Sequence, residues 1–197
     1  YAGLPIDVQK EPIDYLISSS NKCIQGMAGT SFVIAKKEKL AKTQKISPRN
    51  LYLNLWGNNS YIEKTGQFQF TPPVQIVYAL SQALDEFFLE TQNGRTSRYF
   101  KSYETLLSGI EKVGLELLLP KSQHSKLLTA IIEPNSPRYD FMEMHDYFYK
   151  NDITIYPGKG AKQDTFRIAN IGEIDYRDME FFNEKLIHFF EEKNIVN

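Results

Sequence analysis

The stretch that most restricts the fold is residues 13–35, where two short apolar runs flank a segment rich in turn residues. Residues 13–17 and 31–35 are each short, apolar and bounded by turn residues, which predicts two buried strands of the parallel-sheet type. Between them lies Ser18-Ser19-Ser20-Asn21-Lys22-Cys23-Ile24-Gln25-Gly26. The pattern therefore predicts that Lys22 lies just beyond the end of a strand, among small residues.

Lys22 has two interpretations at this point. A lysine can attack an aldehyde when its amine is fixed in place, partly desolvated and free to lose its proton. Small neighbours leave room for such a partner. However, most lysines of any chain are solvated side chains without a chemical role. Taken alone, Lys22 could be either.

The charge balance and the cysteine content limit the partners and the compartment. The 197 residues are 42% hydrophobic with a net charge of −1, and no apolar run approaches the ~20 residues that span a bilayer. Because nucleic-acid surfaces need a marked basic excess, we expect neither nucleic acid nor membrane as a partner. The single cysteine, Cys23, cannot form an internal disulfide, which favours a reducing cytoplasm. His124, His145 and His188 lack metal-ligand spacing, so no metal site is expected.

The remaining pattern predicts a second, smaller domain. Before it we expect a helix at 36–47, an irregular segment or short strand at 51–56, an extended segment at 67–73 and a helix at 74–91. The dipeptide Asn93-Gly94 predicts a break, and the domain boundary is placed there. The elements expected beyond it are a helix at 96–113, strands at 116–119 and 129–132, a helix at 139–150, strands at 153–156 and 165–170, and a helix at 175–193. Such an order indicates a small α+β layer domain.

Two further residues are candidates for anion binding. Thr71, in Phe70-Thr71-Pro72-Pro73, precedes a predicted helix whose N-terminal N–H groups favour an anion. An ordinary N-terminal cap is the simpler interpretation from the residues alone. Arg167, in Thr165-Phe166-Arg167-Ile168-Ala169-Asn170-Ile171-Gly172, suits bidentate binding of a carboxylate or phosphonate, and a position on an edge strand or a structural ion pair explains it equally well.

Two other features have weaker functional interpretations. Tyr156-Pro157-Gly158-Lys159-Gly160 lacks the glycine spacing and the Ser/Thr ending of a phosphate loop, so a tight turn between strands is expected. Cys23, beside Lys22, is expected to be a small packing residue rather than a nucleophile.

These strings together resemble the class V aminotransferases of fold type I, which use pyridoxal 5′-phosphate. The run around Lys22 is most similar to the branch that transaminates 2-aminoethylphosphonate with pyruvate, giving phosphonoacetaldehyde and alanine. Asn21 points to the same branch, because many other class V members have His, Gln or Arg before the lysine. Another class V activity, such as alanine:glyoxylate or serine:pyruvate transamination, is the alternative.

The resemblance implies a role for each candidate residue. Lys22 would bind the cofactor covalently through an imine and then act as the base that moves a proton during transamination. Thr71 would contact the cofactor phosphate of the neighbouring subunit in a homodimer. Arg167 would bind the anionic end of the substrate, first a phosphonate and then a carboxylate.

The resemblance also covers only about the C-terminal half of such an enzyme. It implies a partial α/β fold of type I, with residues 1–95 as the end of the cofactor-binding large domain and 96–197 as the small domain. The chain starts Tyr1-Ala2-Gly3 without an initiator Met, so we expect a fragment that is inactive alone. The carboxylate that faces the pyridine nitrogen would lie upstream, since Asp7 and Asp14 are too far along the chain. Unpaired strand edges would leave the N-terminal part dimerised, rearranged or disordered, with residues from about 96 onward native-like.

Overall fold

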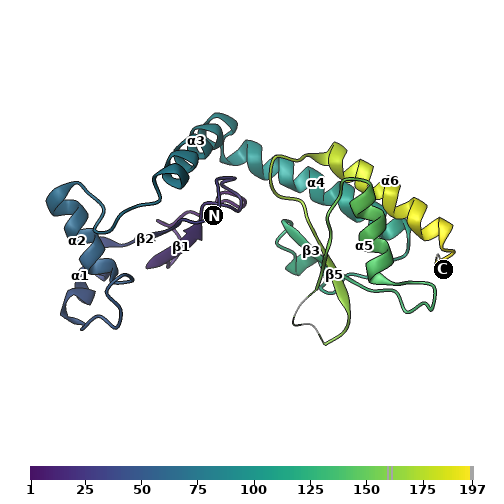
Figure 1. The fold of residues 1–197 in the computed structure, drawn as a ribbon, viewed down its shortest axis with the longest axis horizontal. Helices are drawn as coiled ribbons and strands as arrows, with labels where there is room; N and C mark the ends of the chain where they lie inside the picture. Colours follow the sequence, from purple (N-terminus) through teal and green to yellow (C-terminus); the bar gives the residue numbers. More distant parts are fainter. Residues whose placement is uncertain (159, 161, 196–197) are drawn as a thin grey trace. The chain divides into compact units, whose positions relative to one another are not determined.

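The computed structural model describes residues 1–158, 160 and 162–195. The chain divides into two compact units, Tyr1–Thr91 and Gln92–Asn197. The first unit is built on a two-stranded hairpin, in which β1 (Tyr15–Ser19) pairs with β2 (Ser31–Ala35), as Figure 1 shows. Its helices are α1 (Lys37–Lys42), the 3₁₀ turn η1 (Thr43–Lys45), α2 (Leu55–Thr65) and α3 (Val74–Glu90).

The hairpin corrects the expectation of parallel-type strands. The second strand has the predicted bounds, but the first begins two residues later than expected and the two strands run antiparallel. Parallel neighbours need a crossover of roughly a dozen or more residues, usually a helix, and residues 20–30 contain no helix. The strands are also not buried on both faces, because Leu16 is 9% exposed whereas Ile17 is 73% exposed.

Residues 51–54 form a turn, which agrees with the irregular segment expected there, and a helix that was not predicted begins at Leu55. Asn54 is the N-cap of α2, and its side chain accepts a hydrogen bond from the Gly57 N–H at 3.0 Å. The helix ends at Gly66, whose φ of 69° lies in the left-handed region that glycine adopts without strain. The capping Asn and terminal Gly are the sequence signals that identify this helix. The predicted helices near 36–47 and 74–91 are confirmed as α1 with η1 and as α3.

The second unit begins with a long helix, α4 (Gln92–Lys112). Asn93 and Gly94 lie in its first turn, so the break predicted at these two residues lies slightly earlier, at Thr91 between α3 and α4. The first N–H groups of a helix have no intrahelical partner, and residues with low helix propensity are therefore tolerated at this end. The remaining elements are η2 (Lys121–Gln123), β3 (Leu128–Ile132), α5 (Phe141–Lys150), β4 (Tyr156–Pro157), β5 (Thr165–Ala169) and α6 (Tyr176–Glu192).

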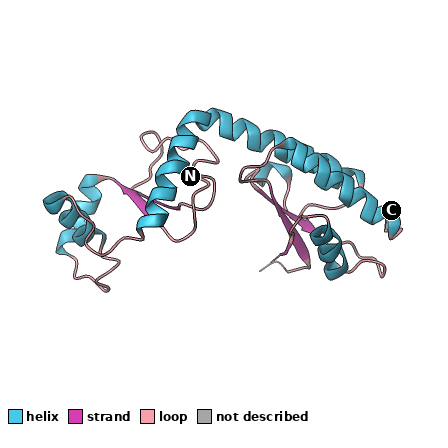
Figure 2. Ribbon diagram, turned by 45° about the horizontal axis from the view of Figure 1, so that its top comes forward, coloured by secondary structure: helices cyan, strands magenta, loops and turns pink. Residues whose placement is uncertain are grey.

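The strands of the second unit form an antiparallel sheet in the order β3-β5-β4. The strand expected at 116–119 is only a single bridge, between Leu117 and Ile131. Helices α4 and α6 lie side by side along this sheet (Figure 2). Within the described part of the chain, no helix has the length and apolar character required to cross a membrane.

The main hydrophobic core lies in the second unit. It joins residues of α4, α5 and α6 to one face of the sheet, and its fully buried members include Leu106, Ile131, Phe148, Phe166 and Leu186. The rings of Phe148 and Phe182 stack with their centroids 4.8 Å apart, which ties α5 to α6. No residue of the first unit belongs to this cluster of buried residues.

Candidate active site

Lys22 lies in the turn that follows β1, and its side chain is exposed. Fully buried Ser20 holds this turn in place: its carbonyl accepts from the Gly26 N–H at 2.8 Å, and its Oγ donates to the Thr30 carbonyl at 3.1 Å. The Lys22 carbonyl accepts from the Gln25 N–H at 2.9 Å. The backbone of Lys22 is therefore fixed while its amine projects away from the core.

The residues that follow Lys22 are buried and anchor the turn. Cys23 and Ile24 are 6% and 1% exposed, so the thiol is buried, in agreement with the expected packing role. Gln25 has a φ of 68°, in a region that costs a non-glycine residue about 1–2 kcal/mol. Nζ of Lys22 makes no hydrogen bond or ion pair with residues that the structure describes. The amine of Lys22 is thus open to an aldehyde on a fixed backbone, whereas the partial desolvation that a reactive lysine needs is not provided by the described residues of this chain.

Helix α3 packs against this turn. A Cβ added to Gly29 would lie 2.4 Å from Cδ1 of Ile76, and one added to Gly26 would lie 3.6 Å from Cα of Leu80. The turn after Lys22 and the first half of α3 are thus in direct contact. The start of α3 and the Lys22 turn therefore lie in the same unit.

Thr71 lies immediately before α3 and is exposed. The N-cap of α3 is Pro73, and no side chain caps the helix by a hydrogen bond. The interpretation of Thr71 as an ordinary N-cap is therefore wrong. Thr71 precedes, by two prolines, a helix whose N-terminal N–H groups favour an anion.

Arg167 lies at the centre of β5, on the outer face of the sheet. It pairs with Ala130 of β3 and with Tyr156 of β4, and directly paired residues share one face. Its sequence neighbours Phe166 and Ile168 are buried and point to the opposite face. Ala130 and Tyr156 could not be identified from the sequence as neighbours of Arg167, because only the strand register brings them beside it.

The guanidinium of Arg167 is half-buried and only partly used. Its Nε donates to the Pro157 carbonyl at 3.2 Å, and this bond fixes the direction of the group. The terminal Nη1 and Nη2 atoms make no hydrogen bond or ion pair with any described residue. The structural ion pair that was the alternative for Arg167 is therefore absent from the described part of the chain. Two parallel N–H donors remain for a carboxylate or phosphonate.

The carboxylates nearest to the Lys22 segment along the chain are already paired. Asp7 binds Lys10 at 3.1 Å, and Asp14 binds Lys39 at 2.8 Å. These lysine hydrogen bonds lower the pKa of both carboxyl groups. Both carboxylates are therefore engaged by lysines of the same unit. The described residues contain no group of three or more His, Cys, Asp or Glu arranged to hold a metal ion.

The three predicted site residues divide between the two units. Lys22 and Thr71 lie in the first and are linked through α3, whereas Arg167 lies in the second. Of the segment 156–160, Tyr156 and Pro157 form β4, and Lys159 lies outside the described residues.

Comparison with known proteins agrees with these features. The family model "Aminotransferase class-V" matches residues 1–169. The 2-aminoethylphosphonate–pyruvate transaminase of Salmonella paratyphi B is 40% identical over 183 residues, covering 91% of this chain and 49% of the relative. A bifunctional phosphonoacetaldehyde hydrolase/aminoethylphosphonate transaminase of Clostridioides difficile is 39% identical over 182 residues, covering 91% of this chain and 28% of the relative. The chain thus spans about half the length, or less, of the curated relatives it matches.

Solved structures agree in fold. Pyridoxamine–pyruvate aminotransferase from Mesorhizobium loti superposes with a TM-score of 0.87 at 18% identity, covering 98% of this chain and 50% of that one. Ureidoglycine–glyoxylate aminotransferase from Bacillus subtilis gives a TM-score of 0.82 at 19% identity, covering 98% and 51%. The fold is therefore α/β and corresponds to part of the aminotransferase fold of type I.

Proposed function

This chain belongs to the class-V aminotransferase family, and we propose that the protein it comes from transaminates 2-aminoethylphosphonate with pyruvate, producing phosphonoacetaldehyde and alanine. The observation that carries the proposal is the Lys22 turn, which fixes the backbone of the lysine and leaves its amine without a described protein partner. The names of the relatives at 39–40% identity support the choice of substrates. Pyridoxal 5′-phosphate is the proposed cofactor, since the family depends on it.

Lys22 has two proposed tasks. Its Nζ would hold the cofactor covalently, and as a free amine it would take a proton from the substrate carbon. When bound, pyridoxal 5′-phosphate supplies the electron sink for the charge left on that carbon. The rigid turn serves both tasks, because a fixed backbone limits the positions that Nζ can reach.

Thr71 and Arg167 bind the two anionic groups in this proposal. Thr71, exposed beside the start of α3, donates its hydroxyl to the cofactor phosphate of a neighbouring subunit, which makes the protein a homodimer with shared sites. Arg167 offers its two Nη groups to the phosphonate of 2-aminoethylphosphonate and then to the carboxylate of pyruvate. A delocalised planar cation suits both anions.

We further propose that residues 1–95 are the C-terminal part of the cofactor-binding domain and 96–197 the small domain of a longer, cytoplasmic enzyme. The 197 residues alone are then expected to be inactive. Both Asp7 and Asp14 are engaged by lysines, and this leaves the pyridine nitrogen without a carboxylate from the start of this chain.

Substrate profiling of the full-length protein tests the activity. We expect turnover of 2-aminoethylphosphonate with pyruvate, detected as alanine and phosphonoacetaldehyde, and its loss in Lys22→Ala. Alanine with glyoxylate and serine with pyruvate are the comparison pairs. Turnover of those pairs without turnover of 2-aminoethylphosphonate would contradict the substrate assignment and favour another class V activity.

A separate trapping experiment tests the inactivity of the short chain. The 197-residue chain is mixed with pyridoxal 5′-phosphate and reduced with borohydride, and the modified lysines are mapped by mass spectrometry. We expect weak labelling spread over exposed lysines and no transamination. Stoichiometric labelling at Lys22 together with transamination would show that the short chain is a complete enzyme.

A further inference from the structure

We propose that Asn170 is a positioning residue that holds the β5 strand, and with it Arg167, in the place where the arginine binds substrate. The proposal rests on the substrate role proposed for Arg167. Asn170 follows β5 directly and is fully buried. It does not itself contact the sheet face on which Arg167 lies, so its effect is transmitted through the backbone of β5.

The side chain of Asn170 joins three segments. Its Nδ2 donates to the Tyr99 carbonyl in α4 at 2.9 Å and to the Lys126 carbonyl at 3.0 Å. Its backbone N–H donates to the Leu127 carbonyl at 3.1 Å, which extends the pairing of β5 with β3 by one step. Its Oδ1 is buried without a hydrogen-bond partner among the described residues. Because its oxygen is unpaired, the Asn170 amide stabilises the structure through its two N–H donors.

One of these bonds holds a strained residue at the entrance to β3. Lys126 has a φ of 61°, in the left-handed region that is unfavourable for a residue with a side chain. Its carbonyl is an acceptor for Asn170, so the bond stabilises the conformation that starts β3. Because β3 is the neighbour of β5, both strands are fixed at the same end by one side chain.

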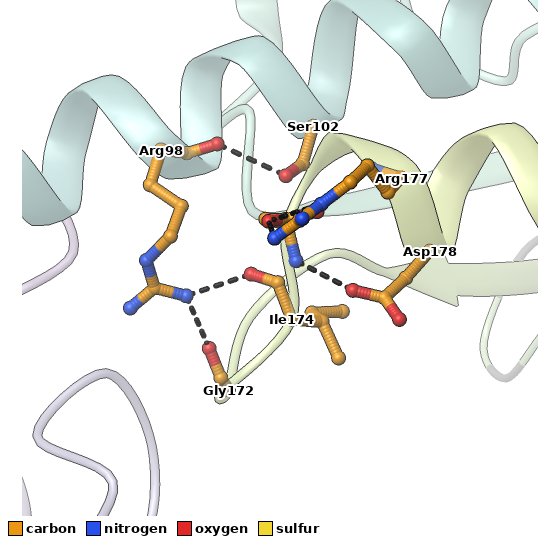
Figure 3. Close-up of polar contacts among 7 residues, drawn as sticks. Arg98, Ser102, Gly172, Ile174, Arg177 and Asp178 are labelled. Atoms are coloured by element: carbon orange, nitrogen blue, oxygen red, sulfur yellow. Dashed lines mark hydrogen bonds and ion pairs between the residues drawn. The ribbon is translucent and has the colours of Figure 1, made fainter.

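Helix α4 also holds the loop beyond Asn170, as Figure 3 shows. Nη1 of Arg98 donates to the carbonyls of Gly172 and Ile174, each at 2.7 Å. The hydroxyl of Tyr99 accepts from the Gly172 N–H at 3.2 Å. The segment between β5 and α6 is thus fixed at successive points by one turn of α4.

This anchoring matters for Arg167 because of the period of a strand. Side chains alternate between faces, and a shift of one residue in register would turn Arg167 from the outer face into the core. Smaller shifts change the distance between Arg167 and the Pro157 carbonyl, which directs the guanidinium. A misplaced guanidinium therefore makes weaker hydrogen bonds to the substrate anion.

Four variants of the full-length protein test the proposal. Asn170→Ala removes both donors, and Asn170→Ser retains one smaller donor in case the alanine variant does not fold. Asn183→Ala is the matched control: Asn183 is 7% exposed, donates to the Thr105 carbonyl of α4 at 2.6 Å and also has an unpaired buried Oδ1, but it lies on α6. Arg167→Lys tests the premise. The measurements are kcat, the KM for each substrate, the melting temperature, and the dissociation constant of the unreactive dianion phosphonoacetate by calorimetry.

We expect Asn170→Ala to raise both KM values and the dissociation constant by about tenfold, the effect of losing roughly one good hydrogen bond, with kcat changed less than about twofold. Asn170→Ser should fall between this variant and the wild type, and Asn183→Ala should lower the melting temperature without changing either KM. If Asn170→Ala and Asn170→Ser lose thermal stability as Asn183→Ala does and keep the wild-type KM values, Asn170 is only structural and the proposal is wrong. If Arg167→Lys also keeps those values, the substrate role of Arg167 fails instead.

Discussion

Replacing Gly109 by alanine should reverse the usual effect of this substitution. In the middle of a helix, Gly→Ala normally stabilises by about 1 kcal/mol. Gly109 lies in α4 where α6 crosses it, and an added Cβ would lie 2.1 Å from both Cγ and Oδ1 of Asn183 and 2.7 Å from its Cβ. Such distances cannot be accommodated by a rotation of the Asn183 side chain alone, because its Cβ is fixed to the backbone of α6.

The magnitude follows from three contributions. Overpacking of a well-packed contact costs about 1–3 kcal/mol, and displacing Asn183 breaks its bond to the Thr105 carbonyl, worth about 1 kcal/mol. The gain in helix propensity offsets about 1 kcal/mol. We expect Gly109→Ala to destabilise the second unit by about 1–3 kcal/mol.

Hydrogen exchange of the β3 and β5 amides measures this change, because their protection reports opening of the unit. Protection should fall by roughly 5- to 150-fold in Gly109→Ala, whereas Ser108→Ala, at the exposed position beside it, should change it little. In an Asn183→Ala background two of the three close contacts are gone, so Gly109→Ala should cost clearly less. Two results would refute the idea that the Gly109–Asn183 contact determines the cost. One is an equal loss of protection from Gly109→Ala in both backgrounds, and the other is a gain in protection when Gly109→Ala is introduced alone.

Three further predictions concern other parts of the chain. Tyr139→Phe should stabilise the second unit by up to about 1 kcal/mol in chemical unfolding, because the Tyr139 hydroxyl is buried without a described partner. Tyr103→Phe removes a 2.8 Å hydrogen bond to His124 and should destabilise the unit. The reverse order of stabilities would contradict the idea that the unpaired Tyr139 hydroxyl destabilises the fold. The hydrogen bond from Lys39 lowers the pKa of Asp14 below its ordinary value of 3.8, so its contribution to stability is present above that pH and is lost as the pH falls through the folded-state pKa. Asp14→Asn should therefore unfold at a lower denaturant concentration than the wild type at neutral pH, and at the same concentration once the carboxyl is protonated. If the difference between the two unfolding midpoints is as large in acid as at neutral pH, this ion pair is not its cause. Finally, amides of β1 and β2 should exchange faster than those of β3 and β5, because the large buried cluster lies in the second unit, and equal protection would show that the hairpin is as stable as the core.

The sequence predicted element types best where a pattern was local and contiguous. Helix α3 was anticipated from its apolar face and from the prolines before it, and β2 from a short apolar run between turns. Strand direction was not predictable, since whether β1 and β2 pair antiparallel depends on the path of the connection rather than on either strand's composition. The start of α4 was missed because a terminal position tolerates the Asn-Gly pair that would break a helix interior.

In the candidate site, too, residues within a local string were predictable and their partners from distant segments were not. Lys22, Thr71 and Arg167 could be named because each sits in a short contiguous string. The residues around Arg167 could not, because Ala130 and Tyr156 reach it only through the pairing of three strands. Asn170 was visible within its string, but its partners lie 71 and 44 residues away in sequence, at Tyr99 and Lys126. No local pattern encodes such contacts.

With the role proposed for Arg167, the two faces of the β3-β5-β4 sheet would allow substrate choice and stability to change separately. Phe166 and Ile168 contribute to the core from one face, whereas Arg167, Ala130 and Tyr156 share the other. A substitution at Ala130 or Tyr156 alters the shape and polarity beside the guanidinium without removing a residue from the core. On the proposed role of Arg167, single replacements on the outer face would change the preference for the anionic substrate with little loss of folded protein, and a mutagenesis library limited to these two positions would sample them directly.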